Sequence, residues 1–337
     1  MRDRRRAGVE FSPRHAALAR VTTPFGLDGS SRGEGGRVIG GDIHLIRSAV
    51  PHRSLLAVVL WMSGALLAFS ATAVAVRALT PAFSVFEILA VRNAAGIAIL
   101  LACALLRPEL RPGLKPRRFR LHLARNVVHF ASTDGWAFGL TLLPLATVFA
   151  LEFTTPVWVA LLAIPLLRER MTRGRFVAVA LGFAGVLVIL RPGVETLQPA
   201  SLLMLAVALG FAFVAIMTKH LTRTESTFSI LFFMNLLQLP MNLAGVSGAF
   251  WLRIVPSHAL PLIGVCAGGL LSHYCLTNAY RQGDATMVVP LDFLRIPLIA
   301  LVGWQLYGEA LDPYVFVGSG CIIAGILYSL RREAKTA

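Results

Sequence analysis

The residues of this sequence that could do chemistry are eight ionisable side chains within long apolar stretches. Placing such a group in an apolar layer is costly, so it normally faces a partner or an internal cavity and marks a functional position. The eight positions are Glu87, Arg92, His129, Asp134, Glu152, His273, Asp292 and Arg295.

Three of these residues suggest ion pairing or the recognition of a charged ligand. Arg92, with Asn93 beside it, could bind an anionic substrate group such as a carboxylate through its planar donor fork. It could equally neutralise an acidic residue on another helix. Asp292 and Arg295 stand three residues apart and so share a helix face. We expect an intrahelical ion pair there, with a gate that opens on substrate or proton binding as the alternative.

Glu152 is the candidate for proton coupling. It has no basic residue within its own helix turn, and an unpaired carboxyl in an apolar layer favours its neutral form. Glu152 and Asp292 are related by the repeat described below and are expected at opposite depths, with Glu152 nearer the outer face. They are therefore predicted to be gates at the two ends of one pathway. A protonated, hydrogen-bonded carboxyl without such a role is the alternative.

The remaining candidate contacts are polar or aromatic residues. Trp61 could stack on a flat substrate ring, although aromatic residues near span ends are more often interfacial anchors. His129 alone is expected to be a packing residue. The predicted substrate-binding residues are Trp61, Arg92, Asn93, Asp134, His273, Tyr274 and Asn278, and the predicted gating or coupling residues are Glu152, Asp292 and Arg295.

The sequence indicates neither a metal site nor a cofactor. The four cysteines stand in apolar segments without CxxC spacing. There is no GxxxxGK[ST] nucleotide-binding loop and no HExxH zinc motif, and the carboxylates of the apolar segments do not stand at ligand spacing from histidines. We therefore expect no metal and no cofactor, and we do not expect an enzyme.

The elements that must position these side chains are membrane-spanning helices. Hydrophobic residues make up 56% of the chain, charged residues 15%, and the mean hydropathy is +0.70. Apolar runs of about twenty residues match the thickness of a bilayer, and a helix satisfies its own backbone polar groups there. Ten spans are predicted, at residues 55–77, 83–106, 121–143, 145–167, 174–191, 199–219, 226–248, 259–280, 285–307 and 313–330.

The basic residues set the expected orientation. The formal net charge is +15, but these residues gather in short loops, which argues against nucleic-acid binding. With the N-terminus inside, thirteen of them fall in inner loops, and only Arg77, Arg191 and Arg253 fall in outer loops or span ends. The positive-inside rule thus predicts an inner-membrane protein with both termini cytoplasmic. Residues 1–53, basic and glycine-rich, are predicted to be a disordered cytoplasmic tail that could attract anionic lipid.

An internal repeat divides the chain into halves. A shift of 140 residues sets Leu151-Glu152-Phe153 on Leu291-Asp292-Phe293 and Glu169 on Glu309. With five spans in each half, the second half must enter the membrane in the opposite sense. This predicts an all-α integral membrane protein of ten transmembrane helices, arranged as two inverted five-helix repeats at residues 54–193 and 194–337. Inverted repeats recur in secondary transporters, with the substrate site between the halves.

Four strings carry a family resemblance. They are LPLATVFALEFTTPVWVALLAIPLLRER at 143–170, GRFVAVALGFAGVLVILRPG at 174–193, AYRQGDATMVVPLDFLRIPLIALVGWQLYGE at 279–309 and GSGCIIAGILYSLRRE at 318–333. The chain from about Leu55 to Glu333 resembles the drug/metabolite transporter superfamily, in its ten-helix EamA-type branch. Glu152 departs from the small or neutral residue that this resemblance implies at its position.

The resemblance implies secondary transport of a small organic metabolite across the inner membrane. Similar proteins move amino acids, nucleosides, S-adenosylmethionine or riboflavin. The expected partners are this small molecule, membrane lipid and, as a hypothesis, protons, with no nucleic acid. The alternative functions are a membrane channel and a non-transporting membrane-embedded enzyme or scaffold.

Overall fold

The computed structural model describes residues 55–143, 148, 151–191, 199–308 and 313–336. The tail predicted at residues 1–53 and the repeat position Glu309 lie outside the described residues.

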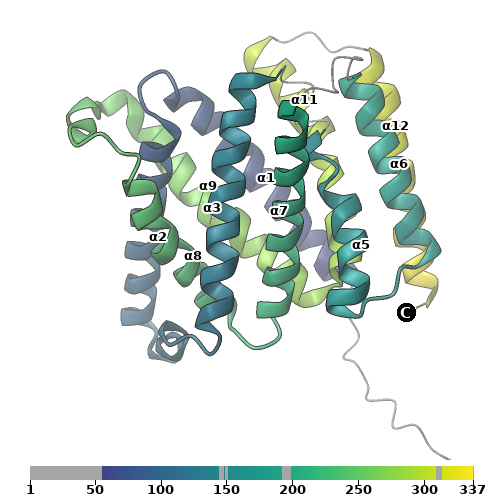
Figure 1. Cartoon of the computed structure of the whole chain (residues 1–337), viewed down its shortest axis with the longest axis horizontal. Helices are drawn as coiled ribbons and strands as arrows, with labels where there is room; N and C mark the ends of the chain where they lie inside the picture. The colour runs from purple at the N-terminus through teal and green to yellow at the C-terminus, as the bar shows by residue number, and fades with distance from the viewer. Residues whose placement is uncertain (1–54, 144–147, 149–150, 192–198, 309–312, 337) are drawn as a thin grey trace, which may run out of the picture. The chain divides into compact units, whose positions relative to one another are not determined.

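All regular elements in these ranges are helical (Figure 1). The α-helices are α1 (Leu55–Leu79), α2 (Val85–Leu106), α3 (Phe119–Leu142), α5 (Thr155–Leu167), α6 (Arg173–Leu190), α7 (Pro199–Leu221), α8 (Thr227–Leu243), α9 (Ala259–Gln282), α10 (Ala285–Val288), α11 (Arg295–Tyr307) and α12 (Pro313–Thr336). Short 3-10 segments are η1 (Pro108–Leu114), η3 (Phe250–Arg253), η4 (Pro256–His258) and η5 (Val289–Leu294).

Much of the helical surface is apolar and faces outward. Six segments of the described chain are long and apolar enough to cross a membrane, and only 28–44% of each apolar window is buried inside the protein. Leu105 and Leu260, for example, are 72% and 79% exposed. Such a surface would be unfavourable in water but matches the hydrocarbon of a bilayer. The protein is therefore an all-helical, multi-pass membrane protein. The six segments are Leu55–Leu79, Val85–Leu106, Pro199–Leu221, Pro256–Gln282, Ala285–Gln305 and Pro313–Lys335.

The span predicted at 285–307 is broken in its middle. It consists of α10, η5 and α11, and the break contains Pro290, which lacks the N–H that a continuing α-helix would use. Asp292 lies in η5, three residues before α11 begins at Arg295. Glu152 likewise lies three residues before α5 begins at Thr155. The two repeat-related carboxylates therefore both precede a short helix.

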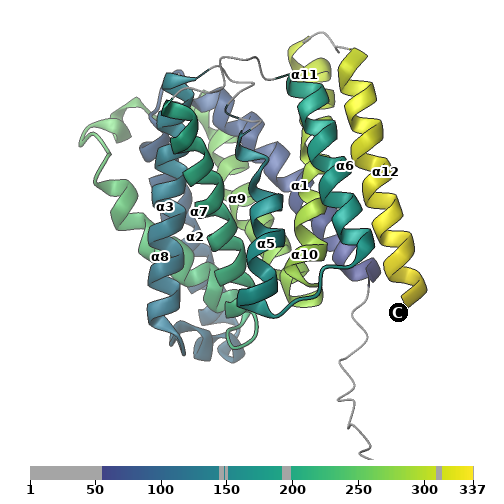
Figure 2. The same cartoon turned by 45° about the vertical axis from the view of Figure 1, so that its right-hand side comes forward.

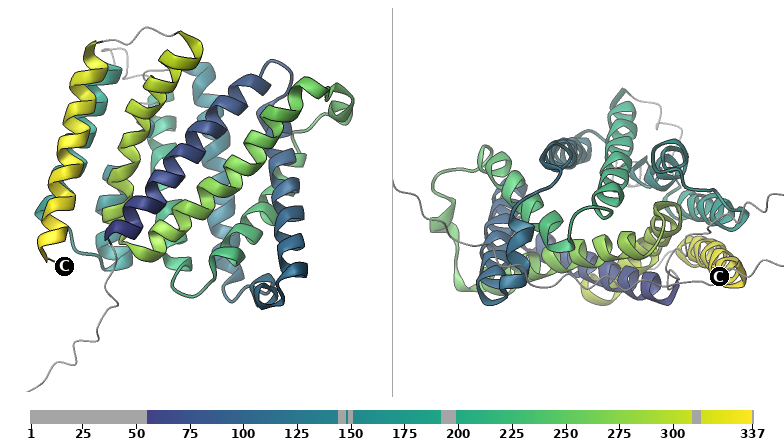
Figure 3. Two further views of the ribbon diagram at one scale, coloured as in Figure 1. Left: turned by 180° about the vertical axis from the view of Figure 1, so that it is seen from behind. Right: turned by 90° about the horizontal axis from the view of Figure 1, so that it is seen from below.

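The helices pack in pairs that join distant parts of the sequence. The most extensive contacts are α1 with α9, α6 with α12, α3 with α7, and α2 with α8. Figure 2 shows α6 beside α12, and the left view of Figure 3 shows α1 and α9 running side by side. Each of these pairs joins a helix before residue 191 to one after residue 198, so the two parts of the chain are packed against each other throughout.

Glycines allow α6 and α12 to approach at backbone distance. A Cβ on Gly185 would meet the carbonyl oxygen of Gly318, and a Cβ on Gly318 would meet that of Gly185. On Gly325 a Cβ would come within 2.9 Å of Leu181 Cβ. Small residues at such contacts let membrane helices pack closely. Gly320 of α12 takes no part in this contact, because nothing lies within 4 Å of a Cβ built there.

We predict that Gly185→Leu destabilises the protein, because the new side chain must push α12 away from α6. The expected loss is roughly 1–3 kcal/mol, as for other overpacked sites, read as a lower midpoint of thermal unfolding in detergent. Gly320→Leu is the matched control, and it should leave the midpoint unchanged. Equal midpoints for the two variants would contradict the close α6–α12 contact.

Candidate functional site

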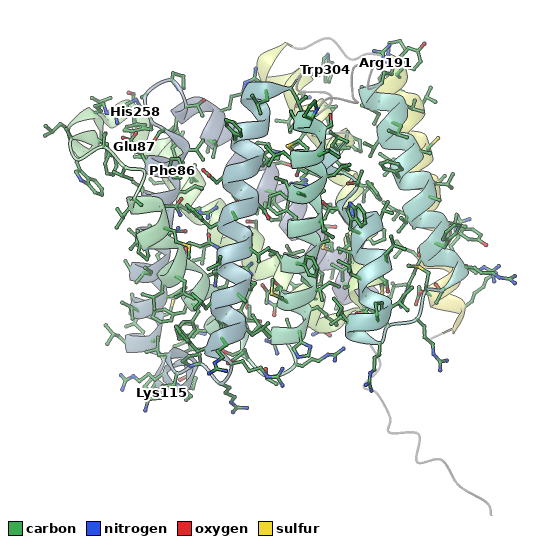
Figure 4. All side chains as sticks on the ribbon, viewed as in Figure 1. Phe86, Glu87, Lys115, Arg191, His258 and Trp304 are labelled. Carbon is green, nitrogen blue, oxygen red and sulfur yellow. The ribbon has the colours of Figure 1, made fainter. Side chains whose placement is uncertain are left out.

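A cavity of about 330 Å³ lies inside the bundle, within the size range of small-molecule sites. Its wall draws on α1, α2, α3, α5, α7, α8, α9, η5 and α11. Phe86, near the start of α2, lines it and lies towards the end of the bundle opposite Lys115 (Figure 4). The polar and ionisable lining residues are Arg92, Arg125, His129, Thr133, Asp134, Glu152, Thr155, Thr218, Gln238, Asn242, His273, Thr277, Tyr280, Asp292 and Arg295.

One group of cavity charges is held together by Arg295. Its Nη2 lies 3.0 Å from Asp292 Oδ2 and 3.4 Å from Glu152 Oε1. Trp136 Nε1 donates to the other oxygen of Glu152 at 2.7 Å, and the guanidinium lies 5.2 Å from the ring centroid of Phe153. The predicted Asp292–Arg295 ion pair is thus present, and it continues to a second carboxylate.

This arrangement corrects the placement predicted for Glu152 and Asp292. They are not at opposite ends of a pathway, because both contact one guanidinium group. Glu152 also has a basic partner, contrary to the expectation drawn from its own helix turn. The partner comes from a residue 143 positions later in the chain, which local spacing could not reveal.

A second group of polar side chains lies on α3 and α8. Arg125 donates to Thr218 Oγ1 at 3.2 Å and to Asn126 Oδ1 at 2.8 Å. Gln238 donates to the same Asn126 oxygen at 2.9 Å and lies 3.0 Å from His129 Nδ1. His129 therefore belongs to a polar network at the cavity and is not simply a packing residue.

Histidine and phenylalanine rings form an aromatic wall along the cavity. The ring of Phe69 lies edge-on to His273 at a centroid distance of 5.6 Å, His273 to His129 at 5.9 Å, and His129 to Phe211 at 6.2 Å. All four side chains line the cavity. Edge-to-face contacts of this kind stabilise aromatic clusters, so the wall presents fixed rings to a bound molecule.

The cavity gathers six of the ten predicted site residues and leaves four outside its lining. Arg92, Asp134, Glu152, His273, Asp292 and Arg295 line it. Trp61 and Tyr274 instead contact each other at 5.6 Å between ring centroids, and Tyr274 is 42% exposed. Asn278 accepts a hydrogen bond from Thr227 at 3.0 Å. Asn93 is fully buried.

The cause of these four differences is helix geometry. A residue turns by about 100° along a helix, so the neighbour of a lining residue faces elsewhere. On α9 the cavity is lined at His273, Leu276, Thr277 and Tyr280, which share one face, whereas Tyr274 does not. Trp61, Asn93, Tyr274 and Asn278 each stand next to a lining residue in the sequence but face away from the cavity.

Arg125, Gln238 and Asn242 are lining residues that the sequence analysis did not select. A signal for them existed. Arg125 precedes His129 by four residues, and Gln238 precedes Asn242 by four, a spacing that puts each pair on one helix face. Two polar residues at this spacing in an apolar helix predict a shared polar face.

Polar contacts close the bundle at the end where the C-terminus lies. Glu169, between α5 and α6, accepts the backbone N–H groups of Ala285 and Thr286, each at 2.9 Å, at the start of α10. Lys219 on α7 donates to the backbone oxygens of Tyr280 and Gly283. Figure 1 places the α5–α6 connection near the C-terminus. These contacts tie the two halves together at that end of the bundle.

The family model described as "EamA-like transporter family" matches the chain twice, at residues 56–191 and 198–331. A curated riboflavin transporter of Rhizobium johnstonii is 32% identical over 281 residues, which is 82% of this chain and 91% of the relative. The riboflavin transporter of Brucella anthropi is 31% identical over 251 residues, covering 72% and 87% of the two chains. An S-adenosylmethionine uptake transporter of Rickettsia felis is 27% identical, covering 66% and 75%.

A solved crystal structure shares the fold, with a TM-score of 0.67 at 19% sequence identity over 82% of this chain and 98% of that one. The family that matches both parts of the chain is a transporter family, and the curated relatives are transporters, so the chain is a membrane transporter rather than an enzyme. The chain belongs to the EamA-like transporter family, within the drug/metabolite transporter superfamily.

Proposed function

We propose that this chain is a secondary transporter that moves a small organic metabolite across the inner membrane by alternating access. The observation that carries the proposal is the cavity, which is lined from both family-matched segments. It also includes the carboxylates that precede α5 and α11. Alternating access uses a site of this kind, between halves and beside interrupted helices. The candidate substrates are amino acids, nucleosides, S-adenosylmethionine and riboflavin, and the names of the relatives favour the last two.

We expect saturable counterflow in proteoliposomes that contain the purified chain. Riboflavin and S-adenosylmethionine are the first substrates to load inside, with the same compound labelled outside. A carrier accelerates the entry of label when the inside is loaded, because the loaded site returns faster than the empty one. Entry that is linear in concentration and indifferent to internal loading would instead indicate a channel.

Ten membrane spans in two inverted units, residues 54–193 and 194–337, are the architecture that we propose. Besides the six long apolar segments, α3, α5, α6 and α8 complete the ten. The helix pairings are consistent with two repeated units of the same internal arrangement. If each helix is replaced by the helix at the same position in the other unit, the α1–α9 contact becomes α7–α3, and the α2–α9 contact becomes α8–α3. Both counterparts occur. The α2–α8 and α6–α12 contacts map onto themselves.

Both termini are proposed to be cytoplasmic. The C-terminus and Lys115, which belongs to the basic 107–120 loop, lie towards the same end of the bundle (Figures 1 and 4). Arg191, one of the three basic residues expected outside, lies at the opposite end.

Reporter fusions test this orientation. A reporter placed after Ala337 and a second one inserted within residues 107–120 should both report the cytoplasm, because basic loops are retained inside. A fusion within residues 192–198 is the control and should report the periplasm. Opposite signals from the first two positions would contradict both the orientation and the five-plus-five arrangement.

Proton coupling is proposed to occur at Glu152. Glu152, Asp292 and Arg295 carry a net charge of −1 when all are ionised, so one proton neutralises the set. As access alternates, Arg295 can remain with Asp292, its neighbour on the helix, while Glu152 is released. A carboxyl released into an apolar surrounding is stabilised by protonation.

Glu152→Gln should abolish accumulation driven by a pH gradient while sparing substrate exchange, because the amide cannot carry the proton. Asp292→Asn should damage both, since Arg295 then loses its closer partner in a low-dielectric setting. Uptake with and without a pH gradient in proteoliposomes measures the difference. The exposed Glu109→Gln is the control and should behave as the wild type. Unchanged gradient-driven uptake in Glu152→Gln would remove the coupling role.

A further inference from the structure

Two arginines at the cavity, Arg92 and Arg125, find no carboxylate partner among the residues that the structure describes. Within the described part of the chain, no acidic oxygen lies within 4.0 Å of Arg92 or Arg125. The imidazoles of His129 and His273 line the same cavity. The four side chains come from α2, α3 and α9 and are called the arginine–histidine group. Two unneutralised guanidinium groups inside an apolar bundle are unfavourable unless an anion joins them.

The guanidinium groups also retain free donors. Arg92 makes one hydrogen bond in the described ranges, from Nη2 to Asn93 Oδ1 at 3.4 Å. Arg125 uses Nε and Nη1 for Thr218 and Asn126, which leaves Nη2. None of the unused nitrogens is among the buried polar atoms that lack a hydrogen-bond partner. Both side chains line the cavity. Arginine donors that open into a cavity are suited to bind planar or tetrahedral oxyanions.

The carboxylates of the same cavity do not fill this role. Glu152 and Asp292 are held by Arg295. Asp134 is exposed and lies farther than 4.0 Å from every basic group of the described residues. Within the described ranges no acidic residue of another helix neutralises Arg92, which favours the first expectation, the recognition of an anionic group.

The aromatic wall indicates the rest of the ligand. His129 and His273 belong both to the arginine–histidine group and to the row of rings that extends to Phe69 and Phe211. A molecule with an oxyanion at the arginines therefore places its next atoms against rings. Flat π-systems pack on such walls, and their edges and faces complement aromatic side chains.

We infer that the transported molecule is a planar heterocycle that carries an oxyanion, a carboxylate or a phosphate. The oxyanion binds between Arg92 and Arg125, and the ring lies against the wall formed by Phe69, His273, His129 and Phe211. This inference rests on the proposed function, since it takes the cavity as the substrate site.

Matched ligand pairs test the inference by equilibrium binding to the purified full chain in detergent. Riboflavin and riboflavin 5′-phosphate form the phosphate pair, and indole-3-acetamide and indole-3-acetate form the carboxylate pair. In at least one pair the anion should bind about tenfold more tightly than its neutral partner, because it gains charge-assisted hydrogen bonds. Whichever pair shows the difference identifies the oxyanion.

Arginine variants assign the preference to the site. Arg92→Gln, which removes one hydrogen bond of the described structure, should abolish the preference, whereas Arg92→Lys should retain part of it. Arg125→Lys tests the second arginine with its charge kept and its bidentate fork removed. The exposed Arg107→Gln is the control and should retain the full preference. Thermal unfolding of each variant separates a lost site from a lost fold.

Three results would overturn the inference: no preference in either pair, no binding of any of the four compounds, or a preference that survives Arg92→Gln in a folded protein. Failure of the proposed function is distinguishable. Anion preference without counterflow would contradict secondary transport and support the oxyanion site. Counterflow of riboflavin without anion preference would support transport and contradict the oxyanion site.

Discussion

The Arg295 guanidinium group joins two segments in which the helix is interrupted. Glu152 and Asp292 each lie beside an interruption of helix, where the backbone can no longer satisfy all its own polar groups. One cation between two anions links the two interruptions directly. The two family-matched halves are therefore coupled at their breaks, and the packing of α5, η5 and α11 around the cavity depends on this three-membered contact.

The cavity is consequently divided into two electrostatic parts. At Arg295 the cation is paired with carboxylates of the protein itself. At Arg92 and Arg125 the described residues supply no carboxylate within 4.0 Å, which suits the binding of an anionic ligand. A polar site inside a membrane protein can thus serve cohesion and recognition at once, provided that different residues carry the two roles.

The sequence predicted the helical membrane fold well because apolar length and loop charge are local properties. It also selected Arg92 and His273 correctly as cavity residues, since an ionisable group in an apolar helix must find a polar surrounding. It failed for Asn93 and Tyr274, their direct neighbours, because the rotation of a helix about its axis is set by tertiary packing. The Arg295–Glu152 contact, 143 residues apart, was beyond any local pattern.

Glu169 binds the start of α10 mainly through backbone N–H groups, those of Ala285 and Thr286. Every amino acid except proline offers the same N–H, so these two hydrogen bonds do not depend on which side chains occupy those positions. Only the third bond, from Thr286 Oγ1 at 2.9 Å, requires a particular side chain. The contact can therefore survive sequence drift in α10, and the same contact could serve relatives whose cavities differ. Proline at either position is the exception, since it would delete a donor and leave a buried carboxylate short of a partner.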